Sequence, residues 1–157
     1  MKKEEIEANP ILKITFEFSL LIIDFCDLLD GMKKYTISRQ LLKSATSIGA
    51  NSMEAQNAES KPDFIHKIKI AAKEADETQY WLLLCSLSNK YPESDSLLVK
   101  LESIQKVLNK ILGTAKKKSQ ISDFVSLFYF RFRSKNNLVF KPLKYHRISS
   151  LAYQLIS

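Results

Sequence analysis

Two histidines are the residues best suited to metal or acid–base chemistry in this chain, and their neighbours decide what they could do. His66 follows Asp63 in a D-x-x-H arrangement, which places both side chains on one face of a helix. A di-iron bundle needs two Glu-x-x-His pairs and two further carboxylates, whereas His146 follows Leu143 at that spacing. One half-site is not a metal site, so we expect neither a metal nor another cofactor.

The other signatures of catalysis are missing as well. The glycines Gly31, Gly49 and Gly113 are scattered and form no phosphate-binding loop. Cys26 and Cys85 do not cluster with histidine as a zinc site requires. No Ser–His–acid constellation suggests itself. We therefore predict that the protein is not an enzyme and has no catalytic residue.

The two cysteines carry information about location. Both fall inside apolar patterns of helical period, and no signal peptide precedes them. This favours buried, reduced thiols and a cytoplasmic protein. No apolar run approaches the roughly 18–20 residues of a membrane span, so we expect no membrane partner.

One polar stripe remains as a candidate site. Its members recur at helical steps on two successive segments and are Ser47, Asn51, Glu54, His66, Lys73, Glu77 and Tyr80. Lys73 and Glu77 stand four residues apart, which allows an ion pair. Three interpretations stay open: a solvated face, a polar network that sets helix register or lines a subunit interface, and a catalytic carboxylate. Of the neighbours Tyr80 and Trp81, we expect one in the core and one as an interface anchor.

Four amphipathic helices must position these residues. Hydrophobic periodicity predicts helices over residues 10–29, 37–58 and 61–89, and a fourth from 94 or 95 that fades at 113 or within 116–118. The predicted inward stripes are Ile11, Ile14, Phe18, Leu21, Phe25 and Leu28; Leu41, Ala45, Ile48, Ser52 and Ala55; Phe64, Ile68, Ala71, Ala75, Thr78, Leu82 and Cys85; and Leu97, Leu101, Ile104, Leu108 and Ile111. Short connections make consecutive helices antiparallel. The fold class is therefore all-α: an antiparallel up-down-up-down four-helix bundle over residues 10–115, followed by a basic, aromatic C-terminal extension, 116–157.

Local signals punctuate these helices. Ser60 and Asp63 read as a capping box, with Pro62 in the first turn where its missing N–H costs nothing. Asp30-Gly31 is typical of a helix C-terminus. Gly49 costs about 1 kcal/mol inside a helix relative to Ala, which indicates close approach of another helix.

The positive charge is confined to the C-terminal extension. Nine of the 24 basic residues and one of the 17 acidic residues lie from Lys116 onward, which leaves the body near −1 and the extension near +8. The residues that could contact nucleic acid are Lys116, Lys117, Lys118, Arg131, Arg133 and Lys135. Over residues 128–133, phenylalanine alternates with tyrosine or arginine, which predicts a strand. Residues 134–137 resemble a turn, and residues 138–140 could form a return strand. Two interpretations follow: an aromatic, basic arm for nucleic acid, and a loosely packed appendage, which we favour because a lone hairpin is marginal in water.

Long, correctly spaced sequence words reveal a family resemblance. They are SRQLLKSATSIGAN (38–51), EAQNAES (54–60), DFIHKIKIA (63–71) and KEADETQYWL (73–82). Through them, residues 13–115 resemble the four-helix-bundle protein family, also called 23S rRNA intervening-sequence proteins. The resemblance implies an antiparallel four-helix bundle and a homo-oligomer, often a ring-shaped pentamer, but no reaction. A similar bundle is the accessory protein of diversity-generating retroelements, where it works with a reverse transcriptase and nucleic acid.

This chain departs from the family pattern in two places. Family chains usually end near residue 115, so the basic extension lies outside the resemblance. Ser52-Met53 replaces a commonly apolar position and a variable one. We expect a non-catalytic, self-associating bundle that acts as a scaffold or assembly protein. The alternative is an accessory protein that binds RNA or DNA non-specifically, with a reverse transcriptase or rRNA as partner.

Overall fold

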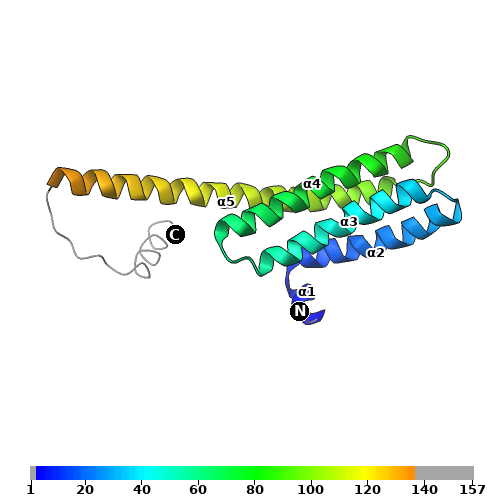
Figure 1. Cartoon of the computed structure of the whole chain (residues 1–157), viewed down its shortest axis with the longest axis horizontal. Helices are drawn as coiled ribbons and strands as arrows, with labels where there is room; N and C mark the ends of the chain where they lie inside the picture. The colour runs from blue at the N-terminus through cyan, green and yellow to red at the C-terminus, as the bar shows by residue number, and fades with distance from the viewer. Residues whose placement is uncertain (1–2, 137–157) are drawn as a thin grey trace. The chain divides into compact units, whose positions relative to one another are not determined.

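The computed structural model describes the backbone of residues 3–136 and the side chains of residues 3–115. Its helices are α1 (Lys3–Ala8), α2 (Pro10–Gly31), α3 (Tyr35–Gln56), α4 (Lys61–Ser86) and α5 (Asp95–Asn136), shown in Figure 1. The chain divides into two compact units, Met1–Lys118 and Ser119–Ser157, so the boundary falls inside α5. In the first unit, the four long helices form an all-α bundle with antiparallel packing.

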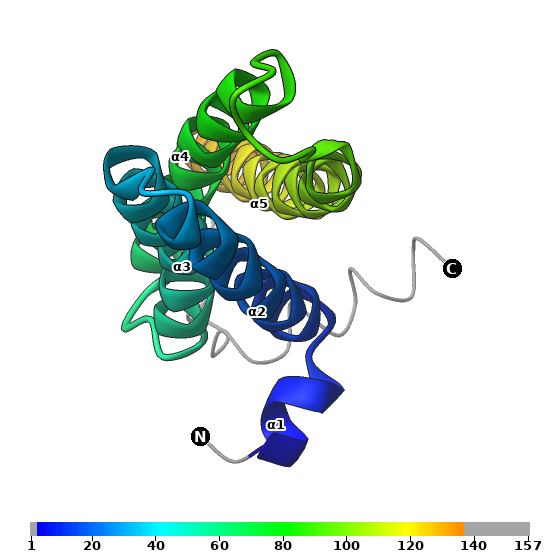
Figure 2. The same cartoon turned by 90° about the vertical axis from the view of Figure 1, so that its right-hand side faces the viewer.

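The four predicted helices are confirmed as elements, and the bounds of the first three differ from the predicted ones by only two or three residues. Helix α3 begins and ends two residues earlier than predicted, and α4 ends at Ser86 instead of residue 89. The short helix α1 was not predicted. Figure 2 looks along the bundle and shows α3 between α2 and α4, the two helices against which it packs.

The end of the last helix was predicted wrongly. Helix α5 continues through Gly113 and the Lys116–Lys118 run as far as Asn136, so the strand over 128–133 is helical instead. The alternation there is short, and the chain has no proline between Pro92 and Pro142 that would stop a helix. The predicted return strand, 138–140, lies outside the described residues.

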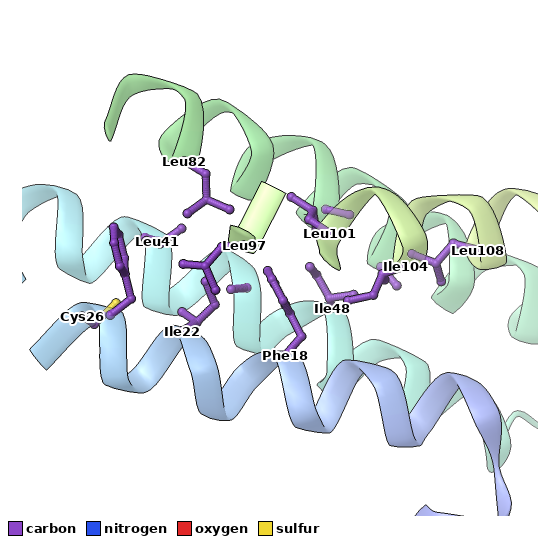
Figure 3. Packing of buried hydrophobic residues seen from close by; sticks show 14 of the residues in the cluster. Phe18, Ile22, Cys26, Leu41, Ile48, Leu82, Leu97, Leu101, Ile104 and Leu108 are labelled. Carbon is purple, nitrogen blue, oxygen red and sulfur yellow. The ribbon is translucent and has the colours of Figure 1, made fainter. Parts of the chain in front are cut away.

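The inward stripes meet in one apolar core (Figure 3). The predicted stripes of α3, α4 and α5 are confirmed as buried or partly buried. In α2 one assignment is wrong, because Leu28 is 60% exposed while Ile22 and Leu29 are fully buried. Nine of the twelve residues from Phe18 to Leu29 are apolar, so the sequence offers two parallel stripes and periodicity alone does not choose between them.

Small and hydroxyl side chains fill the space between α3 and α4. The Thr78 hydroxyl lies 3.0 Å from the Ser44 hydroxyl and donates to the Glu74 carbonyl oxygen at 2.7 Å. Ser52 donates to the Ile48 carbonyl oxygen at 2.8 Å. Within residues 3–115, no buried side-chain nitrogen or oxygen lacks a hydrogen-bond partner. These polar residues can therefore occupy core positions without the cost of an unsatisfied group.

Gly49 faces α2, as its position in the helix predicted. A Cβ atom built there would lie 3.6 Å from the hydroxyl oxygens of Thr15 and Ser19. That distance is ordinary van der Waals contact, so the two helices approach closely but leave room for alanine.

The turn between α2 and α3 uses a residue that the sequence did not indicate. Lys33 adopts a left-handed conformation, φ 59°, and Gly31 does not. The Lys34 N–H donates to the Leu29 carbonyl oxygen at 2.8 Å, and the Lys33 N–H donates to that of Asp30 at 2.9 Å. This is the Schellman pattern, in which glycine is the usual left-handed residue. The glycine of the predicted Asp30-Gly31 stop stands two positions too early.

Replacing Lys33 with glycine should therefore stabilise the protein. A non-glycine residue pays about 1–2 kcal/mol in the left-handed region, and Lys33→Gly removes much of that cost. We expect the free energy of unfolding, measured by urea titration, to rise by about 1 kcal/mol. Lys33→Ala keeps the Cβ atom and is the control; an equal gain for alanine would show that the backbone conformation is not the cause.

Candidate functional site: the polar edge between α3 and α4

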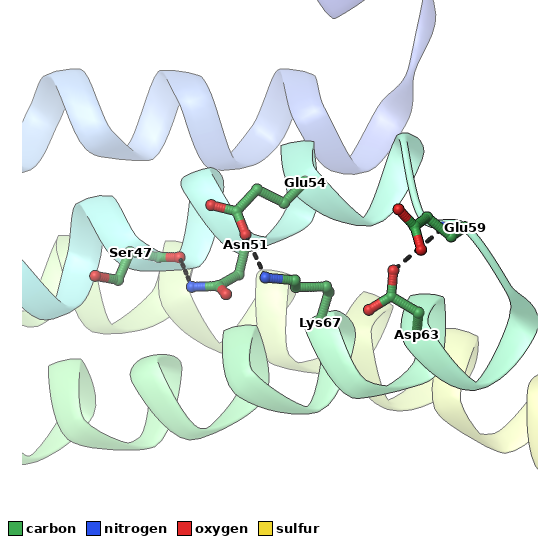
Figure 4. A network of polar contacts seen from close by, with 6 residues as sticks. All are labelled: Ser47, Asn51, Glu54, Glu59, Asp63 and Lys67. Atoms are coloured by element: carbon green, nitrogen blue, oxygen red, sulfur yellow. Dashed lines mark hydrogen bonds and ion pairs between the residues drawn. The ribbon is translucent and has the colours of Figure 1, made fainter.

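Part of the predicted polar stripe lies along the edge where α3 meets α4. The Asn51 side-chain amide donates to the Ser47 carbonyl oxygen at 2.9 Å. One turn further, the Lys67 Nζ atom lies 2.6 Å from Glu54 Oε2 and joins the two helices (Figure 4). The partner of Glu54 is thus Lys67, a residue that the stripe did not include. In the sequence, this pairing was indicated only by the short connection of residues 57–60, which folds α4 back so that the first turns of α4 face the end of α3.

The start of α4 is fixed by the predicted cap. The Ser60 hydroxyl accepts a hydrogen bond from the Asp63 N–H at 3.3 Å. The Asp63 carboxylate in turn accepts from the Glu59 N–H at 3.2 Å, one residue before the cap itself. Asp63 is thereby committed to the helix terminus. His66 is exposed, and the side chains described, those of residues 3–115, include no group of three or more His, Cys, Asp or Glu that could hold a metal ion.

The predicted members on α4 do not form a network with α3. His66, Lys73, Glu77 and Tyr80 are all exposed. The predicted ion pair of Lys73 with Glu77 is not formed; Glu77 Oε1 instead accepts from the indole N–H of Trp81 at 3.3 Å. For these four residues, exposure agrees with the solvated-face interpretation, one of the three that the sequence left open.

Tyr80 and Trp81 lie on different sides of α4, with Trp81 toward the core and Tyr80 at the surface, while the predicted role of one of them as an interface anchor stays a prediction. Trp81 is half-buried against the apolar core, whereas Tyr80 is 56% exposed. Their rings meet edge to face, with centroids 5.1 Å apart and planes at 71°. Trp81 thus contacts both Tyr80 and Glu77, and the Tyr80 side chain remains more than half exposed.

The electrostatics of this edge are those of a solvated surface. The hydrogen bond and charge of Glu54 raise the pKa of Lys67, which keeps the amine protonated at neutral pH. Partial burial, and next the nearby Glu77 carboxylate, raise the pKa of Glu74. An exposed ion pair contributes little stability. The edge can therefore hold two helices in register, and its lysine is poorly suited to act as a base.

Both cysteines are buried in the core, as the sequence indicated. Burial raises the pKa of Cys85 to about 11, with a smaller effect of the nearby Cys26. Burial also raises the pKa of Cys26, against the opposing effect of its contact with Ser38. Raised pKa values oppose the thiolate form that reacts with electrophiles and metals.

The predicted nucleic-acid contacts all fall within α5. Lys116, Lys117, Lys118, Arg131, Arg133 and Lys135 are helical residues whose side chains lie outside the described part of the chain. Within the described residues, no helix is long and apolar enough to cross a membrane.

The fold defines the class of protein, which is an antiparallel bundle of four long helices with small residues packed between α3 and α4. Residues 7–110 match the family described as 23S rRNA-intervening sequence protein, and the chain belongs to that family. A solved structure from Bacteroides thetaiotaomicron VPI-5482, a protein with unknown function from the S23 ribosomal protein family, is similar to it. The two are 37% identical, with a TM-score of 0.62, and the match covers 65% of this chain and 97% of that one. No curated protein matches the chain.

The burial of the cysteines predicts slow thiol chemistry. At pH 7.5, a pKa of about 11 leaves roughly 0.03% of Cys85 as thiolate. We expect Ellman's reagent to modify neither cysteine at an appreciable rate in the folded protein, and both within minutes in 6 M guanidinium. Rapid labelling of one thiol in the native state would contradict this buried arrangement.

Proposed function

We propose that this protein is a non-catalytic helical bundle that self-associates and acts as a scaffold or assembly protein. The observation that supports the proposal is the apolar surface of the first unit. Large hydrophobic side chains with more than a third of their surface exposed include Phe16, Leu20 and Ile23 on α2, Tyr80, Leu83 and Leu84 on α4, and Leu87 directly after α4.

Exposed apolar residues are normal when they are scattered singly, but contiguous ones mark interaction sites. Here they recur at steps of three and four on two helices, so each set forms a continuous stripe. Burying such stripes against another copy would remove them from water and stabilise an assembly. The solvated polar edge between α3 and α4 offers no comparable driving force.

Self-association predicts a mass larger than one chain in solution. We expect light scattering of the full chain to give a whole multiple, greater than one, of its mass of 18.0 kDa. A chain ending at Lys118 should form an assembly with the same number of subunits. The second expectation follows because both apolar stripes lie before residue 118. A monomer at all concentrations up to about 100 μM would overturn the proposal.

A second candidate function rests on the charge division. The segment from Lys116 onward carries nine basic residues and one acid, outside the family match to residues 7–110. We propose that any affinity for RNA or DNA resides there and is non-specific. A body near −1 offers no net field to attract phosphates, whereas a segment near +8 does.

Truncation tests this second candidate. We expect the full chain to bind single-stranded RNA with an affinity that falls linearly in log–log form as salt rises, because bound lysines and arginines release counterions. A chain ending at Ala115 should bind at least about tenfold more weakly at low salt. Equal binding by the truncated chain would assign the contact surface to the bundle and favour an accessory role over a scaffold role.

A further inference from the structure

The change from the predicted strand to a helix over residues 128–133 alters which residues of α5 share a face. In a strand, Phe128 and Phe130 would lie on the same side, because alternate residues do. In a helix, residues two apart lie on nearly opposite sides, and residues four apart share a face. Phe128 therefore groups with Phe124 and Phe132. Phe130 separates from them.

The helical period reveals one apolar row in the distal half of α5. Five apolar positions fall within roughly a third of the helix circumference. They are Ile121, Phe124, Val125, Phe128 and Phe132, which we call the distal row. Leu127 and Tyr129 fall on its two flanks, and the opposite side holds Ser119, Asp123, Ser126, Phe130 and Arg133. This half of α5 is thus amphipathic, with Phe130 as an aromatic exception on its polar side.

The distal row does not extend the inward stripe of the bundle. That stripe runs along α5 from Leu97 to Ile111. Its period continues at Ala115, Lys118, Ser122 and Ser126, of which only the first is apolar. Between residues 111 and 121 the apolar side of the helix therefore shifts by roughly a third of the circumference. The row also begins after the family match, which ends at residue 110.

Basic residues stand before the distal row and at its end. Lys116, Lys117 and Lys118 precede it, and Arg131, Arg133 and Lys135 lie in its last turns. These six positive charges and the single acid of residues 116–136, Asp123, give this stretch a net charge of +5. An amphipathic helix with an apolar, aromatic side and clustered lysine and arginine is typical of helices that lie on anionic membranes.

We infer that the distal row binds the surface of an anionic lipid membrane, with this half of α5 lying in the plane of the interface. The apolar positions enter the boundary between headgroups and acyl chains, and the lysines and arginines neutralise headgroup phosphates. The inference goes beyond self-association and does not rest on it. The expectation of no membrane partner considered only a helix that crosses the bilayer, and a helix that lies on the surface needs no such span.

Two other occupants fit the distal row less well. A coiled coil with a second copy needs heptads sustained over three or four repeats, whereas the row extends only from residue 121 to residue 132. Nucleic acid offers phosphates to the basic residues and bases to single rings. It offers no apolar surface to Ile121 and Val125, which lie among the rings of the row. A lipid interface accommodates both the charge and the continuous apolar row.

Vesicle binding by the full chain tests the inference. We expect the chain to sediment with vesicles of equal parts phosphatidylcholine and phosphatidylglycerol, and to bind phosphatidylcholine alone at least about tenfold more weakly. Raising the salt concentration should weaken the first interaction, because salt screens the attraction to the headgroup charge. A full chain that stays in the supernatant with both kinds of vesicle would overturn the inference.

Two matched substitutions separate the distal row from the rest of the helix. Phe128→Ala and Phe130→Ala remove the same atoms, one set from the row and the other from the opposite side of α5. We expect Phe128→Ala to weaken binding to the anionic vesicles by about tenfold, because the variant buries less apolar surface. Phe130→Ala should leave the affinity within about twofold. Equal losses would place both rings on one face, as in a strand, and would overturn the inferred row; circular dichroism checks that both variants stay helical.

The other occupants would be recognised by results of their own. If the full chain ignores both kinds of vesicle and Phe128→Ala weakens its binding to single-stranded RNA, the row contacts nucleic acid. If the full chain ignores vesicles and a chain ending at Lys118 no longer assembles, the row contacts a second copy. Either result overturns the inference. Binding of anionic vesicles by a monomeric chain would support the inference while the proposed scaffold function fails.

Discussion

Close packing of small side chains between α3 and α4 is the constraint on which the rest of the bundle depends. Ser44 and Thr78 meet at 3.0 Å in the core, and Ala45, Ala71 and Ala75 are fully buried around them. Such residues allow two helices to approach where leucine would hold them apart. Because protein interiors are close-packed, the helices must approach until no void remains between them. α3 therefore becomes the central element, with α2 on its other side through Gly49. α5 then joins through α4, where Ser94 donates to the Leu82 carbonyl oxygen at 2.8 Å.

The core was largely predictable because its period is regular. Three of the four inward stripes were identified correctly from apolar and small residues at steps of three and four. The wrong assignments occur where two apolar stripes are equally compatible with the sequence, or where the structure depends on a single residue. In α2 both Leu28 and Leu29 are apolar, and only packing against α3 decides between them. At Lys33 the chain takes a left-handed conformation without glycine, because the surrounding helices determine where the turn must fall.

The candidate site shows a different limit of sequence reasoning. His66, Lys73 and Tyr80 recur at helical spacing, but spacing says nothing about which way a helix is rotated. The inward stripe of α4, from Ile68 through Leu82, is narrow and made largely of small residues. Most positions around α4 therefore lie at the surface. Only a few positions on this helix face α3, so a polar residue of α4 is more often exposed than directed toward α3. Lys67 contacts Glu54 because it lies at the boundary between the inward stripe of α4 and its exposed surface.

Outward-facing apolar residues on α2 and α4 follow from the same arrangement. A helix that contacts its neighbours on one side needs apolar residues only there, and its other faces are free to carry a second pattern. These faces carry Phe16, Leu20 and Ile23 on α2 and Tyr80, Leu83 and Leu84 on α4, which neither helix needs for its own core. Because α2 and α4 flank α3 on two sides, the angle between their outer faces is set by the packing of α3. The small residues between α3 and α4 thus fix how these two exposed apolar surfaces are inclined to each other.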